Sequence, residues 1–149
     1  NTWGNVLMVN DLIDGISVKL NQVFGDGVKI YSESVKQGLK EPCFFIAVLN
    51  PTQSPMIGVR YFREHPFDIH YFPSKDGGNQ EIQDVASKLF DALEYITLLD
   101  GDLVRGTEMH YEKVDDVLHF FVKYNMFVYK QVEKADPMET LTVNNNVKG

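Results

Sequence analysis

The sequence predicts an α+β fold, an α/β sandwich with two main helices packed on a mostly antiparallel sheet of about five strands that ends in a long hairpin. Three observations predict it. Two segments carry apolar residues at helical spacing, several shorter segments are continuously apolar or alternate with period two, and two long strands joined by a tight turn close the regular part of the chain. This order of elements is typical of helices that cover an antiparallel sheet.

The first helix is predicted over residues 10–24. Its apolar residues recur on one face, at Leu12, Ile13, Ile16, Leu20, Val23 and Phe24. Asn10 is the expected N-cap, and Gly25 and Gly27 are the expected stop. Because Gly15 costs the helix about 1 kcal/mol relative to alanine, we expect a close neighbour at this position.

Strands are expected at residues 28–32, 43–49, 56–63 and 67–72. The unbroken apolar run at 43–49 predicts a central strand that is covered on both faces. Residues 50–55 contain two prolines, which cannot donate to a sheet, and this segment therefore predicts a turn. The pair His65 and Pro66 predicts a break or bend before the next strand begins at Phe67.

The second helix is predicted from an N-cap at Asn79 to about Ile96, after a loop at residues 73–78. Its buried face is expected to comprise Ile82, Val85, Ala86, Leu89, Leu93 and Ile96. Its polar face carries Glu81, Asp84, Lys88, Asp91 and Glu94. A solvent-facing helix side explains this acidic run, and an acidic lining or partner surface is the functional alternative.

The closing hairpin is predicted from strands at 103–113 and 117–129 with a tight turn at 114–116. Alternation places Leu118, Phe120, Val122, Tyr124, Met126 and Val128 on one buried face. Phe121, Phe127 and Tyr129 fall on the opposite face and indicate a second apolar contact. A subunit interface would explain that contact, and so would a covering loop or the C-terminal tail.

The length of 149 residues suits a single domain. We expect an N-terminal extension at residues 1–8, one α+β domain at 9–130 and a polar C-terminal tail at 131–149. The lone Cys43 excludes an internal disulfide framework, and its apolar surroundings predict a buried thiol in a protein of the reducing cytosol. A soluble protein is expected, because no apolar run approaches the roughly 20 residues that span a bilayer.

The charge balance argues against nonspecific nucleic-acid binding as the main task. There are 21 acidic and 14 basic residues, which give a formal net charge of -7. Nonspecific binding depends on clustered lysines and arginines that neutralise phosphates, and the chain has no such stripe.

No catalytic motif is present, so we predict a protein that is not an enzyme and has no catalytic residue, cofactor or metal ligand. The four histidines, His65, His70, His110 and His119, have no ligand partner at a recognised spacing. Asp68 alternates with His70, and Glu108 with His110 and Glu112, so either set could offer ligands to a metal ion. The favoured interpretation is a polar sheet face that is solvated or lies in an interface.

Whole segments and their order carry a resemblance to a known family: residues 10–17, 30–46, 60–63, 66–73, 91–95, 103–106, 118–122 and 145–149. Over nearly the whole chain from Met8, the sequence resembles the tail terminator family found in tail gene clusters of phages and defective prophages. The specificity of the likeness rests on its extent, because no short catalytic motif supports it.

The resemblance implies a structural virion protein that caps the finished tail tube, ends its polymerisation and offers a surface to the head–tail connector. Such subunits close into a ring, commonly a hexamer, so the implied partners are copies of the chain itself, the tail tube protein and the connector, with DNA only as passing cargo. The implied location is the host bacterial cytoplasm before assembly and the virion tail after it. The alternatives are another ring-forming connector or neck protein and, as a weaker one, a small-ligand-binding module.

A ring that conducts DNA is expected to carry acidic residues around its opening, because a lumen that attracted phosphates would retain the genome. The candidates are Glu81, Asp84, Asp91 and Glu94 of the second helix.

Overall fold

The computed structural model describes residues 8–32 and 38–131. Within them the chain forms, in order, α1 (Val9–Phe24), β1 (Lys29–Ser32), β2 (Cys43–Val48), β3 (Thr52–Pro55), β4 (Arg60–Phe72), α2 (Gly78–Ala92), β5 (Tyr95–Thr97), β6 (Leu103–Val114) and β7 (Val117–Tyr129). The predicted extension at 1–8 and tail at 131–149 lie outside the described residues except for Met8 and Gln131, so this division of the chain stays a prediction.

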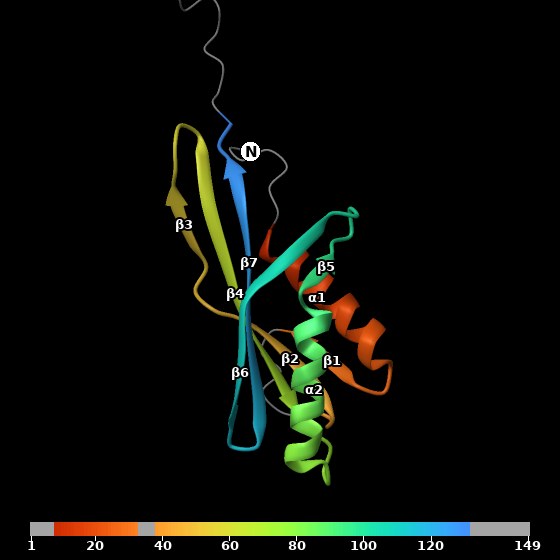
Figure 1. Cartoon of the computed structure of the whole chain (residues 1–149). Helices are drawn as coiled ribbons and strands as arrows, with labels where there is room; N and C mark the ends of the chain where they lie inside the picture. The colour runs from red at the N-terminus through yellow and green to blue at the C-terminus, as the bar shows by residue number, and fades with distance from the viewer. Residues whose placement is uncertain (1–7, 33–37, 132–149) are drawn as a thin grey trace, which may run out of the picture.

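The strands form one sheet in the order β1-β2-β4-β7-β6-β5, with β3 paired to β4 beside this path. The pair β1 and β2 is parallel, and the other pairs are antiparallel. Figure 1 shows α1 and α2 on the same side of the sheet. The α+β class, the two helices, the mostly antiparallel sheet and the closing hairpin are therefore confirmed, whereas the described residues form seven strands instead of about five.

Residues 50–55 do not form the predicted turn. Thr52–Pro55 pairs with β4 as the strand β3, in a register that runs from Thr52 opposite Glu64 to Pro55 opposite Tyr61. Its proline is tolerated because β3 is exposed throughout and lies at an edge, where a missing N–H donor leaves no partner unpaired. The turn follows β3 instead, where the Met56 N–H donates to the Arg60 carbonyl at 2.8 Å.

Of the break or bend predicted at His65 and Pro66, the break is wrong, because β4 runs as one strand from Arg60 to Phe72. The Pro66 carbonyl accepts the Leu49 N–H at 2.9 Å, on the edge of β4 that faces β2 and β3. In an antiparallel strand the N–H and C=O of one residue point to the same edge. The N–H that Pro66 lacks would therefore point to the same edge, at the position between the residues that pair with β2 and those that pair with β3. The pairing of β4 with β7 on the other edge does not need this donor.

The second helix is shorter than predicted. It ends at Ala92 with Leu93 as the C-cap, and residues 95–97 form β5 against β6 instead of a last helical turn. The Gly106 N–H donates to the Glu94 carbonyl at 2.7 Å, which holds the chain against β6. Leu93 and Ile96 are nevertheless both buried, as predicted, because α2 and β5 line the same core.

Both predicted N-caps are wrong by two residues. The N-cap of α1 is Met8, whose N–H donates to the Asp11 carboxylate at 2.9 Å, and the N-cap of α2 is Gly77. Asn10 and Asn79 therefore lie inside the first turns. In each helix an acidic residue of the first turn accepts a hydrogen bond from a backbone N–H ahead of that turn, Asp11 from Met8 and Glu81 from Ser74.

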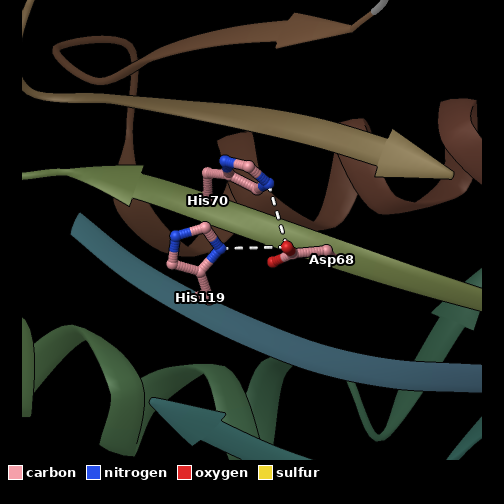
Figure 2. A group of neighbouring side chains, drawn as sticks. All are labelled: Asp68, His70 and His119. Atoms are coloured by element: carbon pink, nitrogen blue, oxygen red, sulfur yellow. Dashed lines mark hydrogen bonds and ion pairs between the residues drawn. The ribbon is translucent and has the colours of Figure 1, made fainter. Parts of the chain in front are cut away.

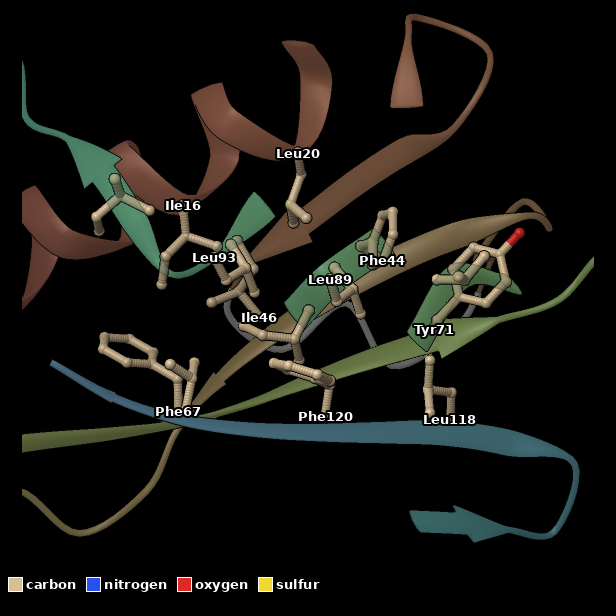
Figure 3. Packing of buried hydrophobic residues seen from close by; sticks show 14 of the residues in the cluster. Ile16, Leu20, Phe44, Ile46, Phe67, Tyr71, Leu89, Leu93, Leu118 and Phe120 are labelled. Carbon is tan, nitrogen blue, oxygen red and sulfur yellow. The ribbon is translucent and has the colours of Figure 1, made fainter. Parts of the chain in front are cut away.

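The core lies between the two helices and one face of the sheet (Figure 3). Leu20 of α1, Leu89 of α2, Phe44 of β2 and Phe120 of β7 are fully buried there. Cys43 is buried as predicted. The close neighbour expected at Gly15 is confirmed, because a Cβ at this position would lie 3.2 Å from Leu98 Cδ2 and 3.3 Å from the Thr97 carbonyl oxygen.

Candidate functional site

The two faces of the sheet have different surroundings. Side chains such as Phe67, Ile69, Phe120 and Val122 point toward the helices and are buried. The alternate side chains point to the other side, which neither helix covers. We call this surface the uncovered face and define it by Phe45, Phe62, Asp68, His70, His119, Phe121, Lys123 and Phe127.

Strand register arranges the middle of the uncovered face in two rows. The first row crosses β2, β4, β7 and β6 through Phe45, His70, His119 and Glu112. The second row runs parallel to it through Ala47, Asp68, Phe121 and His110. Because residues opposite each other on one face are direct neighbours, the two rows bring polar side chains together that are far apart in the chain.

Asp68 is the centre of this arrangement (Figure 2). One carboxylate oxygen, Oδ2, lies 3.0 Å from His70 Nε2 and 2.9 Å from His119 Nδ1. Asp68 is only 8% exposed, and its other oxygen, Oδ1, is buried without a hydrogen-bond partner among the described residues. Burial raises the pKa of the Asp68 carboxyl group, but the hydrogen bonds from His70 and His119 outweigh it and lower the pKa overall.

An aromatic stack lies beside the Asp68 cluster. The Phe121 ring is nearly parallel to the rings of His110 and His119, with centroids 4.7 Å and 6.4 Å apart. Phe121 therefore shares its aromatic surface with both histidines and is half-buried.

A cation joins three strands next to the cluster. Lys123 Nζ lies 3.4 Å from Glu64 Oε1 of β4 and 3.3 Å from Glu108 Oε2 of β6. Hydrogen bonds to Glu108 and Glu64 raise the pKa of Lys123. Glu108 reaches Lys123 from a β-bulge, where the register shifts between Thr107 and His110 and Glu108 takes a φ of 51°.

The end of the uncovered face is apolar and exposed. The Phe127 and Phe62 rings have centroids 5.0 Å apart, and Arg60 Cζ lies 3.7 Å from the centroid of Phe127. Phe127 is 44% exposed and Tyr129 is 59% exposed. Figure 1 shows that this end of β4 and β7 projects with β3 beyond the layer of the helices.

A family model described as phage tail terminator protein matches residues 11–136. That span runs from the first turn of α1 past the end of β7 and covers more than half of the chain. The chain belongs to the phage tail terminator family. The resemblance seen in the sequence is thereby confirmed, and the family is one of structural components of phage tails, which makes this chain a tail component of the virion. No curated protein matches the chain.

The structure places the predicted interface residues of this tail terminator on one surface. Phe121, Phe127 and Tyr129 all lie on the sheet side away from the helices, as strand alternation indicated. They differ in exposure, because Phe121 is stacked among histidines whereas Phe127 and Tyr129 lie at the open end. Their role in contacts between subunits stays a prediction.

The four predicted lumen residues lie on or just after α2, on the other side of the molecule, and two of them have local partners. Glu81 accepts hydrogen bonds from Tyr71 Oη at 2.6 Å, from the Ser74 N–H at 2.7 Å and from the Ser74 hydroxyl. Glu94 Oε2 lies 3.5 Å from Arg105 Nη2. Asp84 and Asp91 are exposed on the helix.

Sequence reasoning paired Asp68 with His70 but did not connect either with His119. The missing information is the register of β4 against β7, which places His70 directly opposite His119. In the part of the chain that the structure describes, Asp68, His70 and His119 are the only group of at least three side chains placed to hold a metal ion. The bulge at Glu108 keeps the second predicted set, Glu108, His110 and Glu112, from forming such a group.

The tail terminator chain also has an open depression of about 700 Å³ between the start of α1 and the turn from β5 to β6. Its polar lining includes Asp11, Asp100, Asp102 and Arg105. Among the described residues, neither helix is long and apolar enough to cross a membrane.

Proposed function

We propose that this chain caps the finished tail tube, ends its polymerisation and provides the surface to which the head–tail connector joins. It acts without catalysis as a closed ring of identical subunits, a hexamer, whose other partner is the tail tube protein. It assembles in the host bacterial cytoplasm and remains in the virion tail, with DNA only passing through. Family membership supports the place in the tail. The observation that carries the assembly role is an exposed apolar surface at one end of the sheet.

We call this surface the apolar end and define it by Met56, Ile57, Val59, Phe127 and Tyr129. The turn between β3 and β4 carries Ile57, which is 90% exposed, and the Lys130 N–H donates to the Val59 carbonyl at 2.8 Å. This bond brings the end of β7 next to the turn. Contiguous apolar surface of this kind is uncommon on a subunit that acts alone, and it marks contact sites.

The composition of the apolar end suits a protein–protein contact. Aromatic residues, methionine and arginine are enriched at the cores of such interfaces, and here Arg60 lies over the Phe127 ring. The proposed contact also includes Phe121, which lies on the same face of β7 beyond Lys123 and Asn125. A contact that joins this surface to a different part of the next copy is head-to-tail, and it closes into a ring if the rotation between copies permits.

The acidic side of α2 supports a lining for DNA passage. We propose that Glu81, Asp84, Asp91 and Glu94 face the opening of the ring, with Asp84 and Asp91 contributing most because Glu81 and Glu94 are bonded within the subunit. A negative lumen repels the phosphates of DNA and lets it pass. A ring structure with lysine and arginine side chains around the opening would contradict this part of the proposal.

Removal of the gene from its phage separates this function from its nearest rival. Over-long tails in electron micrographs are the expected result, because tube growth then has no stop. Tails of normal length that lack heads would instead assign the chain to the neck or connector and overturn the termination role.

A substitution in the apolar end tests the contact surface. Phe127→Ser is expected to leave the subunit folded, since the side chain is outside the core, and to give over-long tails in a complementation assay. Tyr95→Ser is the matched control, because Tyr95 is an exposed strand aromatic with an arginine 5.7 Å from its ring centroid and lies on the outer strand β5, away from the apolar end. Normal tail lengths with Phe127→Ser, or the same defect in both variants, would count against the apolar end.

A further inference from the structure

The Asp68 cluster has the arrangement of a metal-binding site. One carboxylate oxygen and two imidazole nitrogens, from Asp68, His70 and His119, all lie within 4.8 Å of one another. Figure 2 shows both rings directed at the same carboxylate from neighbouring strands. Strand geometry fixes this convergence, because Asp68 and His70 are two residues apart on β4 and His119 is directly opposite His70 on β7.

The distances suit a small four-coordinate ion. Zinc binds imidazole nitrogen and carboxylate oxygen at about 2.0–2.2 Å, which places the donor atoms of a tetrahedral site about 3.3 Å apart. The separations of Asp68 Oδ2 from His70 Nε2 and His119 Nδ1 are 3.0 Å and 2.9 Å. The two imidazole nitrogens lie within 4.8 Å of each other, and side-chain rotation that brings all three separations to the tetrahedral spacing would admit an ion.

The electrostatics of the cluster favour a cation. Asp68 is a buried carboxylate, and its Oδ1 has no hydrogen-bond partner among the described residues. A buried charge that is only partly compensated is costly. A divalent cation held by these three side chains compensates the charge of the carboxylate.

We propose that Asp68, His70 and His119 bind one divalent transition-metal ion, with Zn²⁺ as the best match. Two imidazoles and one carboxylate are ligands for ions of this class, whereas Mg²⁺ and Ca²⁺ prefer oxygen ligands alone. A water molecule on the solvent side of the uncovered face completes the coordination. The ion fastens β4 to β7 at the middle of this face, and the site does not depend on the role in tail assembly.

Direct binding to the isolated full chain tests the proposal. After treatment with EDTA and its removal, calorimetric titration with ZnCl₂ is expected to saturate at one ion per chain. Replacement of Zn²⁺ by Co²⁺ is expected to give the intense visible absorption of a four-coordinate nitrogen and oxygen site. Because an ion that binds only the folded chain stabilises it, Zn²⁺ is expected to raise the melting temperature, and MgCl₂ at the same concentration to leave it unchanged.

Variants separate this site from adventitious binding to surface histidines. His119→Gln retains a hydrogen-bond donor for Asp68 but removes the imidazole ligand, so it is expected to fold and to bind Zn²⁺ at least about tenfold more weakly. His70→Gln gives a second test of the same kind. His110→Ala is the control, because His110 is exposed on the same face and outside the cluster, and it is expected to bind as the unaltered chain does.

Three results would overturn the proposal. They are the absence of stoichiometric Zn²⁺ binding, equal affinity in His119→Gln and the unaltered chain, and loss of binding in His110→Ala alone. Circular dichroism of each variant before titration establishes that a loss of binding reflects the missing ligand and not a failure to fold.

Discussion

The two faces of the sheet show how one strand can serve two purposes. On β7, Phe120 and Phe121 are neighbours in the chain, yet Phe120 is fully buried under the helices and Phe121 is stacked on histidines at the open side. The covered face is almost entirely apolar, and its polar groups are satisfied internally, as in the 2.7 Å hydrogen bond from Tyr124 Oη to the Leu93 carbonyl. The uncovered face mixes aromatic, acidic and basic groups. One face therefore supplies the stability of the subunit, while the other is available for ligands and partners.

The largest expected difference between the faces is at these two phenylalanines. Phe120→Ala is expected to lower the free energy of unfolding by about 3–5 kcal/mol, because it leaves a cavity in a closed core. Phe121→Ala, on the same strand and with the same change of side chain, is expected to cost about 1 kcal/mol. Urea unfolding followed by circular dichroism measures both. Equal losses would mean that the two faces do not differ as described, and Phe120→Leu provides a milder variant if the alanine form does not fold.

A glycine tests how tightly the covered face is packed. A Cβ at Gly106 of β6 would lie 2.5 Å from the Leu93 carbonyl oxygen and 2.8 Å from Val122 Cγ2. Gly106→Ala is therefore expected to destabilise the subunit by about 1–3 kcal/mol. Gly15→Ala is the control, because its contacts of 3.2 Å or more are milder and the helix gains about 1 kcal/mol from alanine. Thermal or urea unfolding that ranks Gly15→Ala as the more harmful variant would contradict this account of the packing.

The smallest expected effect is a dependence on pH from the covered face. His65 is buried at the Tyr124 carbonyl, with Nδ1 3.1 Å from that oxygen. Burial lowers the pKa of His65 from 6.5, the charge of Arg63 acts in the same direction, and the hydrogen bond to Tyr124 opposes both. Folding thus favours the neutral ring. The contribution of His65 to stability is complete above pH 6.5 and declines as the pH falls below that value.

Comparison with a variant that cannot titrate isolates this effect. Between pH 7.5 and pH 5.5, about one unit on either side of the ordinary histidine pKa, the unaltered chain is expected to lose more unfolding free energy than His65→Gln. Both proteins share every other titratable group, so the difference reports His65. An equal decline in the two proteins would show that the ring is not held neutral by the core.

Periodicity in the sequence predicted the parts of the fold that local patterns determine. The burial of Leu118, Phe120, Val122 and Tyr124 on one side of β7 follows from alternation alone. The hairpin turn lies within the predicted residues 114–116, and Asp115 and Asp116 take positive φ values, 50° and 63°, as a two-residue turn requires. The tail terminator family was recognised from the number and order of similar segments, and this recognition does not depend on predicting their secondary structure.

The failures occurred where distant segments override local preference. The prolines of residues 50–55 and Pro66 indicate a turn and a break, but both lie where no ladder partner requires their missing donor. The chain leaves α2 where the Glu94 carbonyl accepts a hydrogen bond from the Gly106 N–H of β6, a residue distant in the sequence. His119 lies next to Asp68 and His70 because of the register between β4 and β7. The sequence of either strand alone does not determine this register.

The outermost strands of the sheet are short, and this limits how copies can pair through them. In the described part of the chain, β1 and β3 have four residues each and β5 has three, with Pro55 in β3. A strand of this length offers few backbone hydrogen bonds to a neighbouring strand, so fibre growth through β1, β3 or β5 is disfavoured. The contact proposed at the apolar end uses side chains instead, and a contact of that kind can end at a fixed number of copies.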